Sequence, residues 1–123
     1  MPARIMIVED DANVAGLLGY LLRRAGFVTD VVPDGRAALQ HVRSHAAPAA
    51  VVLDRMLPHQ DGLAIAAAMR ADPRWLDVPI LLLSASDTDP GRHATLVDAW
   101  IPKPFDPVDL VARLHRLVRA EAA

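Results

Sequence analysis

Short, continuous apolar runs alternate along the chain with longer stretches in which apolar residues recur every three or four positions. Each run lacks the polar alternation of a half-exposed strand and therefore predicts a strand buried on both faces. The five predicted strands cover residues 4–8, 28–32, 49–53, 79–83 and 99–101. The stretches between them have the spacing of helices that place one face on a core.

Aspartate residues stand where four of these helices are expected to begin. A carboxylate at that position accepts hydrogen bonds from the first free N–H groups of a helix. The four residues are Asp11, Asp34, Asp61 and Asp106. Pro107 follows the last of them at a position where a helix needs no N–H donor. A fifth, short helix is expected at 91–98.

Two of the expected helices have clear apolar stripes, which predict the faces that pack on the sheet. The first helix should end at Gly26, because glycine readily adopts the left-handed conformation that closes a helix. Its stripe contains Val14, Leu17, Leu18, Leu21, Leu22 and Ala25. The stripe of the last helix contains Leu110, Val111, Leu114, Leu117 and Val118.

Five strands that alternate with five helices predict an α/β fold, in which a doubly wound parallel sheet is covered by helices on both sides. We expect residues 1–123 to form a single domain, because the chain has the length of one domain and contains no linker or repeat. In such a sheet, ligands bind beyond the carboxyl ends of the strands. The side chains that follow the strands are therefore the candidates for a functional site.

Composition and charge narrow the possible functions. The chain has 13 basic and 15 acidic residues and a net charge of -2, so we expect no direct binding of nucleic acid. It contains no cysteine, which excludes disulfides and thiolate metal sites. The sequence has neither the pattern of a leader peptide nor an apolar run long enough to cross a bilayer. We expect a cytoplasmic protein without a membrane partner.

The predicted strand ends carry polar groups that should meet at one edge of the sheet. Glu9, Asp10 and Asp11 follow the first strand, Asp54 the third, Ser84 the fourth and Lys103 the fifth. Two carboxylates roughly 4 Å apart repel by about 4 kcal/mol at an effective dielectric constant of about 20, so a cluster of acids needs a cation. Oxygen ligands on an open face favour Mg²⁺.

Four motifs at these strand ends resemble those of the receiver domain of two-component response regulators. They are VEDD at 8–11, LDRMLPHQDG at 53–62, LLLSA at 81–85 and WIPKPF at 100–105. The resemblance covers the whole chain and implies a flavodoxin-like sheet with strand order 2-1-3-4-5. It also implies a signalling domain, not an enzyme. Such a domain accepts a phosphoryl group from a sensor histidine kinase or a phosphotransfer protein and acts on a downstream effector, which the sequence leaves unknown.

The resemblance implies roles for the acidic residues. Asp54 would be the phosphoacceptor and would also contact Mg²⁺. Asp10 would bind the ion directly, Glu9 would bind it through a water molecule, and the backbone carbonyl of Met56 would be a further ligand. Asp11 is better interpreted as the cap of the first helix.

The remaining motif residues would bind the phosphoryl group and respond to it. By resemblance, Ser84 would hydrogen-bond the phosphoryl group and Lys103 would pair with it. Trp100 would replace the aromatic residue that turns inward on activation, and core packing is the alternative interpretation. The Lys103–Pro104 peptide bond is expected to be cis.

One departure concerns the output surface. Receivers usually signal through the face formed by the fourth helix, the fifth strand and the fifth helix. The segment from Ser84 to Lys103 is a few residues shorter than receivers usually have, and the shortening falls in the fourth helix. By resemblance, this chain would signal by a conformational change at the same face, while the dimer or partner that this face binds is left open.

Two other interpretations use similar residues or the same fold. A phosphatase of the haloacid-dehalogenase type also has an aspartate nucleophile, but it needs a second acid two positions later, where this chain has Met56. A flavin-binding module needs a phosphate loop rich in glycine and hydroxyl groups after the first strand. Residues 9–14 instead read EDDANV, which would repel phosphate without a metal.

Overall fold

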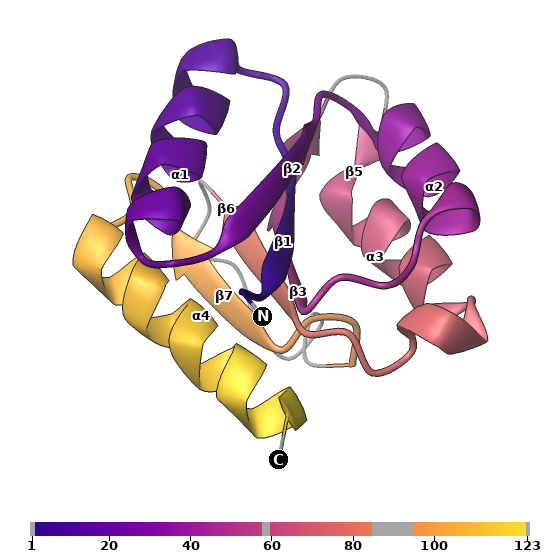
Figure 1. The fold of residues 1–123 in the computed structure, drawn as a ribbon. Coiled ribbons are helices and arrows are strands. Elements are labelled where there is room, and N and C mark those ends of the chain that lie inside the picture. Colours follow the sequence, from indigo (N-terminus) through magenta and orange to yellow (C-terminus); the bar gives the residue numbers. More distant parts are fainter. Residues whose placement is uncertain (1, 58–59, 85–94, 123) are drawn as a thin grey trace.

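The computed structural model describes residues 2–57, 60–84 and 95–122, and the side chains of that set up to residue 119. Five strands form one parallel sheet (Figure 1). In chain order they are β1 (Arg4–Val8), β2 (Val28–Val32), β3 (Ala50–Asp54), β6 (Ile80–Ser84) and β7 (Ala99–Pro102). Their spatial order is β2-β1-β3-β6-β7, so the expected order of the five sheet strands is confirmed.

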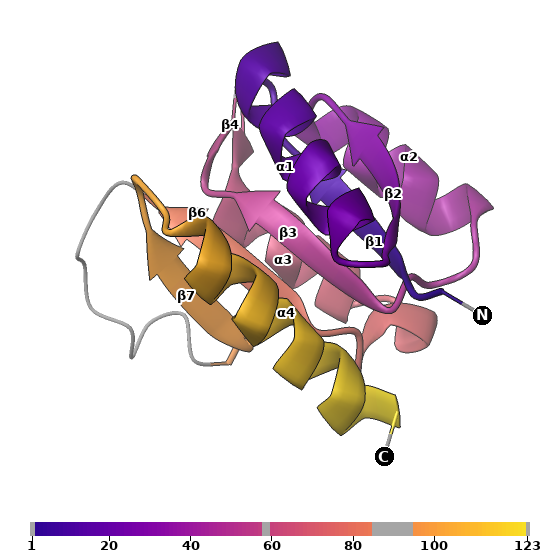
Figure 2. The same cartoon turned by 60° about the vertical axis from the view of Figure 1, so that its left-hand side comes forward.

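Helices cover both faces of the sheet, as expected of a doubly wound α/β fold. The four α-helices of the described residues are α1 (Ala12–Arg24), α2 (Gly35–Ser44), α3 (Gly62–Arg70) and α4 (Pro107–Ala122). Helices α1 and α4 lie on one face, and α2 and α3 lie on the other (Figures 1 and 2). Both termini lie away from the edge where the strands end (Figure 2).

The expected helix starts are confirmed at all four positions. Asp11 accepts from the Asn13 N–H at 2.9 Å, and Asp106 accepts from the Val108 N–H at 2.9 Å. Asp34 and Asp61 cap α2 and α3 in the same way. The end of α1 is also as expected, because Gly26 has a φ of 97° and its N–H bonds to the carbonyl of Arg23.

Strands β1, β3, β6 and β7 contribute alternate residues to two apolar layers. The layer beneath α1 and α4 includes Ile5, Ile7, Leu18, Leu22, Val52, Leu83, Leu110 and Leu114. The layer beneath α2 and α3 includes Met6, Val8, Val51, Leu53, Ile65, Met69, Trp75 and Leu82. Because both faces of β1, β3 and β6 are buried, these central strands are almost entirely apolar, which explains their continuous apolar runs. The expectation of burial on both faces is wrong for the edge strand β2, which contains Thr29 and Asp30 and in which Val31 is 47% exposed.

Several details differ from the sequence prediction. Strands β3 and β6 begin and end one residue later than expected, so that Asp54 and Ser84 are their last residues. The structure adds a two-stranded hairpin of β4 (Met56–Leu57) and β5 (Gln60–Asp61), together with a 3-10 helix, η1 (Pro73–Trp75). These elements are too short to produce a periodic pattern.

Two helix predictions require correction. Leu17 is 47% exposed, so its assignment to the buried stripe of α1 is wrong; the helix packs through Leu18 and Leu22, which lie one turn apart. Of the helix expected at 91–98, residues 95–98 form a turn and a bend. The remaining part, 91–94, lies outside the described residues.

Candidate functional site

The centre of the site is Asp54, the last residue of β3. Its side chain is only 2% exposed. One carboxylate oxygen, Oδ1, accepts hydrogen bonds from the Lys103 ammonium at 2.8 Å and from the Met56 N–H at 3.1 Å. Because β3 is a central strand and hydrogen-bonds to both neighbours, the backbone of Asp54 is held firmly at the edge of the sheet.

Two further acids lie beside Asp54, at the end of the neighbouring strand β1. Glu9, Asp10 and Asp54 each offer one carboxylate oxygen, and these three oxygens lie within 4.8 Å of one another. Asp10 is exposed, whereas Glu9 and Asp54 are buried. Asp11, the next residue, is not part of this group, because its carboxylate caps α1. The interpretation of Asp11 as a cap is therefore confirmed.

Glu9 has the least favourable surroundings of the three carboxylates. Its Oε1 accepts from the Asp11 N–H at 3.2 Å, but its buried Oε2 has no hydrogen-bond partner in the described part of the chain. Burial raises the pKa of Glu9 to about 7, although the Asp11 N–H lowers it, and the nearby Asp54 carboxylate raises it as well. Both observations indicate a carboxylate whose ionised form is poorly stabilised, because burial outweighs the opposing effect of the nearby Lys103 on its pKa.

The cluster fits a small divalent cation. All of its donors are oxygen atoms, two are buried and one is exposed, and Met56 at the mouth is 69% exposed. A site with few protein ligands and an open side suits Mg²⁺, which keeps several of its water molecules. A cation among Glu9, Asp10 and Asp54 would also give the buried Oε2 of Glu9 an electrostatic partner.

Strands β6 and β7 bring Ser84 and Lys103 to the same edge. Ser84 ends β6 and is 1% exposed, and its carbonyl accepts from the Lys103 N–H at 2.7 Å. The Lys103–Pro104 peptide bond is cis, as the sequence analysis expected. Trp100 of β7 is half-buried and packs against the apolar layer beneath α2 and α3.

Gly62, the first residue of α3, packs closely against the backbone of Asp54 and Arg55. Its N–H bonds to the carbonyl of Arg55 at 2.7 Å. A methyl group at this position would lie 2.7 Å from the Arg55 Cα and would collide with the Asp54 carbonyl. The start of α3 can therefore approach the phosphoacceptor candidate this closely only with glycine. The sequence analysis did not identify this contact.

The family model of the response regulator receiver domain matches residues 5–115. The chain belongs to the receiver domain family. A receiver is a signalling domain, and this assignment leaves the phosphatase interpretation without support.

Several relatives of this receiver are named as regulators of transcription or as DNA-binding proteins. The alkaline phosphatase synthesis transcriptional regulatory protein SphR of Synechococcus elongatus is 39% identical over 95% of this chain and 49% of its own length. The DNA-binding response regulator MtrA of Mycobacterium tuberculosis is 41% identical over 97% of this chain and 52% of its own length. The chain thus spans about half the length of the curated relatives it matches.

A solved structure agrees with both the fold and the metal interpretation. The receiver domain of the sensor histidine kinase PA1611 from Pseudomonas aeruginosa superimposes with a TM-score of 0.85 at 26% identity, over 97% of this chain and 99% of that one. It was solved with a magnesium ion in its active site cleft.

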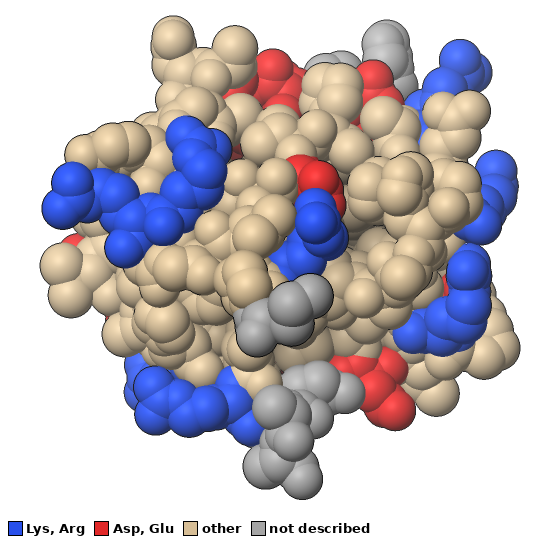
Figure 3. Space-filling model, viewed as in Figure 1, with Lys and Arg blue, Asp and Glu red and all other residues tan. Residues whose placement is uncertain are grey.

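On the face seen in Figure 3, basic side chains lie in several separate groups and do not merge into one patch. No helix in the described part of the receiver is long and apolar enough to cross a membrane.

Proposed function

We propose that this receiver accepts a phosphoryl group on Asp54 in a Mg²⁺-dependent reaction, with a sensor histidine kinase or a phosphotransfer protein as donor. The observation that carries the proposal is the pairing of the buried Asp54 carboxylate with Lys103 at 2.8 Å, beside the carboxylates of Glu9 and Asp10. A nucleophile, a cationic side chain and a metal-binding cluster are the groups that phosphoryl transfer requires.

In the proposed reaction, a carboxylate oxygen of Asp54 attacks the phosphorus atom of a phosphohistidine. A bond between that oxygen and phosphorus forms as the phosphorus–nitrogen bond breaks, and the departing imidazole takes up a proton. The Lys103 ammonium balances negative charge on the phosphoryl oxygens, and the Ser84 hydroxyl donates a hydrogen bond to one of them. Bound Mg²⁺ would supply further positive charge at the same oxygens.

The metal ligands of this proposal are the acidic cluster and one backbone group. Asp10 and Asp54 would contact Mg²⁺ through their carboxylates, Glu9 would act through a water molecule, and the backbone carbonyl of Met56 would complete the protein ligands. The exposure of Asp10 and Met56 supports this assignment, because Mg²⁺ needs room for its remaining water molecules. The receiver would assist only its own phosphorylation and dephosphorylation.

The signal would leave as a conformational change at the face to which β7 and α4 contribute. Movement of Ser84 toward the phosphoryl group would open space into which Trp100 turns, and this change would alter contacts with a downstream effector. The relatives named as transcriptional or DNA-binding regulators are about twice as long as this chain. We therefore assign no nucleic-acid binding to these residues. We also propose a cytoplasmic location, because the receiver must meet the kinase domain that donates the phosphoryl group.

The proposal is tested by incubating the purified protein with acetyl phosphate and measuring its intact mass. We expect one phosphate per chain with Mg²⁺ and none in EDTA or in Asp54→Asn.

The adjacent residues Asp10 and Asp11 provide a matched comparison. Asp10→Asn should lose the reaction, whereas Asp11→Asn should keep it, because asparagine also caps a helix. Equal phosphorylation of wild type and Asp54→Asn would overturn the assignment.

A further inference from the structure

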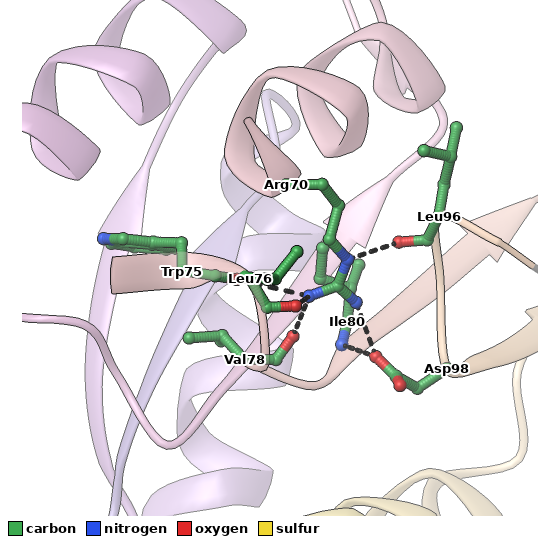
Figure 4. A network of polar contacts seen from close by, with 7 residues as sticks. All are labelled: Arg70, Trp75, Leu76, Val78, Ile80, Leu96 and Asp98. Atoms are coloured by element: carbon green, nitrogen blue, oxygen red, sulfur yellow. Dashed lines mark hydrogen bonds and ion pairs between the residues drawn. The ribbon is translucent and has the colours of Figure 1, made fainter. Parts of the chain in front are cut away.

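Arg70, the last residue of α3, lies at the centre of the polar network shown in Figure 4. Its Nε donates to the carbonyl of Leu96 at 3.1 Å. Its Nη1 contacts three carbonyls, those of Trp75, Leu76 and Val78, at 3.3, 2.9 and 2.6 Å. The guanidinium therefore joins the end of α3 to the turn that leads into β6 and to the segment that leads into β7.

Asp98 completes this network from the entrance of β7. Its Oδ2 accepts from Arg70 Nη2 at 2.7 Å and from the Ile80 N–H at 2.8 Å. The Asp98 N–H in turn bonds to the Ile80 carbonyl at 2.9 Å. The first residue of β6 is thus bonded to Asp98 through both its backbone groups, and Arg70 fixes the carboxylate that makes one of these bonds.

The burial of Arg70 makes these contacts strong. Only 15% of its side chain is exposed, compared with 43% for Asp98. Hydrogen bonds from a guanidinium to carbonyl and carboxylate oxygens are charge-assisted, and the rigid planar group fixes their directions. A flexible side chain with a single donor group could not satisfy acceptors from three separate segments.

Strand β7 depends on such anchors because it lies at an edge of the sheet and is only four residues long. Among the described strands it pairs with β6 alone, and its last residue, Pro102, has no N–H to donate. Its carboxyl end is held by the bond from the Lys103 N–H to Ser84 and by Arg113, which donates to the Trp100 carbonyl at 3.3 Å. The Arg70–Asp98 network holds the amino end.

The register of β7 determines the position of Lys103 relative to Asp54. Lys103 follows Asp98 by five residues, a distance of roughly 16 Å along an extended strand. A slip by one residue would move Lys103 by about 3.3 Å and exchange the two faces of the strand. The contact of 2.8 Å between Lys103 and Asp54 would then be lost.

We propose that the Arg70–Asp98 network fixes the register of β7 and thereby positions Lys103 against Asp54 from the opposite end of the strand. Arg70 and Asp98 are positioning residues in this proposal, since neither touches the site. The consequence for phosphorylation rests on the proposed function, whereas the placement of Lys103 can be tested without it.

The test uses the fact that Lys103 is the only lysine in the sequence. Protein labelled with ¹³C and ¹⁵N in lysine gives a single side-chain signal in an NMR spectrum. In metal-free protein, Asp54→Asn defines the signal of Lys103 without its ion pair. We expect Arg70→Gln to shift the wild-type signal toward that of Asp54→Asn, and to slow phosphorylation by acetyl phosphate by about tenfold or more.

Arg4→Gln provides the matched control. Arg4 pairs with Asp30 at 2.8 Å and links β1 to β2, the strand at the other edge of the sheet. This variant loses an ion pair of the same type and similar length, but β2 carries none of the proposed site residues. We expect the Lys103 signal and the phosphorylation rate of Arg4→Gln to match those of wild type.

The outcomes separate the two proposals. An unchanged Lys103 signal in folded Arg70→Gln would overturn the register proposal and leave Arg70 with a stabilising role only. If the Lys103 signal shifts in Arg70→Gln but the wild-type protein cannot be phosphorylated, the register proposal holds and the proposed function is contradicted. If Arg70→Gln does not fold, Asp98→Ala removes the shared acceptor of Arg70 and of the Ile80 N–H, so the same shift is expected from it.

Discussion

At the carboxyl ends of β1 and β3, three carboxylates share one site, and the buried Oε2 of Glu9 has no hydrogen-bond partner among the described residues. At the amino ends of β6 and β7, the Arg70 guanidinium instead contacts four carbonyls and a carboxylate. Both ends contain charged groups that are largely withdrawn from solvent. The first end has too little positive charge for its acids, whereas the second is internally satisfied.

This difference separates a binding site from a structural support. A buried charge without a partner destabilises the fold, and such a cost is retained where a ligand or a reaction uses the charge. A satisfied network fixes the positions of the segments that it joins. In this receiver, the Arg70–Asp98 network would keep β7 in place, while the acidic cluster at the carboxyl ends of the strands would exchange a metal ion and a phosphoryl group. The comparison predicts that neutral substitutions have opposite effects on stability at the two ends.

The largest effect is expected from Arg70→Ala. Removal of the guanidinium leaves the Asp98 carboxylate and several carbonyls without their donor. We expect the free energy of unfolding in urea to fall by about 3 kcal/mol. The exposed pair of Arg4 and Asp30 is the control, and Arg4→Ala should cost about 1 kcal/mol or less. Similar losses for the two variants would mean that the network has no special strength.

Addition of Mg²⁺ should supply what the acidic end lacks. At a free Mg²⁺ concentration about a hundred times its dissociation constant, we expect the free energy of unfolding to rise by about 2.7 kcal/mol. Asp10→Asn should remove most of this gain, whereas Asp11→Asn should keep it. Thermal unfolding monitored by circular dichroism measures the effect. Equal stabilisation of Asp10→Asn and wild type would place the ion outside the cluster.

The third prediction is that Glu9 makes the free energy of unfolding depend on pH. Its folded-state pKa of about 7 lies above its ordinary value of 4.5, so the folded state holds the proton more tightly than the unfolded state. The resulting stability is fully present below about pH 4.5 and is lost as the pH rises through about 7. For metal-free protein, we expect a loss on the order of 2 kcal/mol over this range.

Glu9→Gln isolates this contribution, because glutamine does not titrate. The difference in unfolding free energy between wild type and Glu9→Gln should grow in favour of the variant as the pH rises from about 5 to about 8. A difference that stays constant over this range would show that Glu9 titrates normally. Saturating Mg²⁺ should reduce the difference, because the cation favours the ionised carboxylate.

The smallest effect concerns the lifetime of the phosphoryl group. Met56 is 69% exposed beside Asp54, and its side chain offers no useful hydrogen bond to an attacking water molecule. We expect Met56→Asn to lose the phosphoryl group severalfold faster, which corresponds to about 1 kcal/mol in the barrier. Leu76→Asn, also exposed but at the other end of the sheet, should decay as wild type does. A Met56→Asn lifetime as long as that of wild type would contradict this role.

The acidic end could be predicted from the sequence because its chemistry is tied to strand ends. Continuous apolar runs located the five strands within about one residue, and parallel strands bring their carboxyl ends together. The residues that follow the runs, including Asp10, Asp54 and Lys103, therefore had to be neighbours. The one-residue error in β3 did not matter, because Asp54 was adjacent to the strand end in either register.

The Arg70–Asp98 network could not be predicted in this way. Arg70 and Asp98 are separated by 28 positions, and each looks like an ordinary surface charge in its local sequence. Their pairing depends on the three-dimensional path of the turn around Trp75, which no local pattern specifies. The exposure of Leu17 and the raised pKa of Glu9 also depend on tertiary packing. Periodicity predicts which face of a helix is apolar, but not how much of that face the sheet covers.

The central claim is that Asp54 carries the phosphoryl group, and chemical trapping tests it most directly. Borohydride reduces an acyl phosphate to an alcohol, which converts a phosphorylated aspartate into homoserine and leaves free carboxylates unchanged. After reaction with acetyl phosphate and Mg²⁺, peptide mass spectrometry should find homoserine at position 54 alone, and EDTA should prevent its formation. Homoserine at Asp10, Asp11 or Asp61 in place of Asp54, or the same yield in EDTA, would contradict the account.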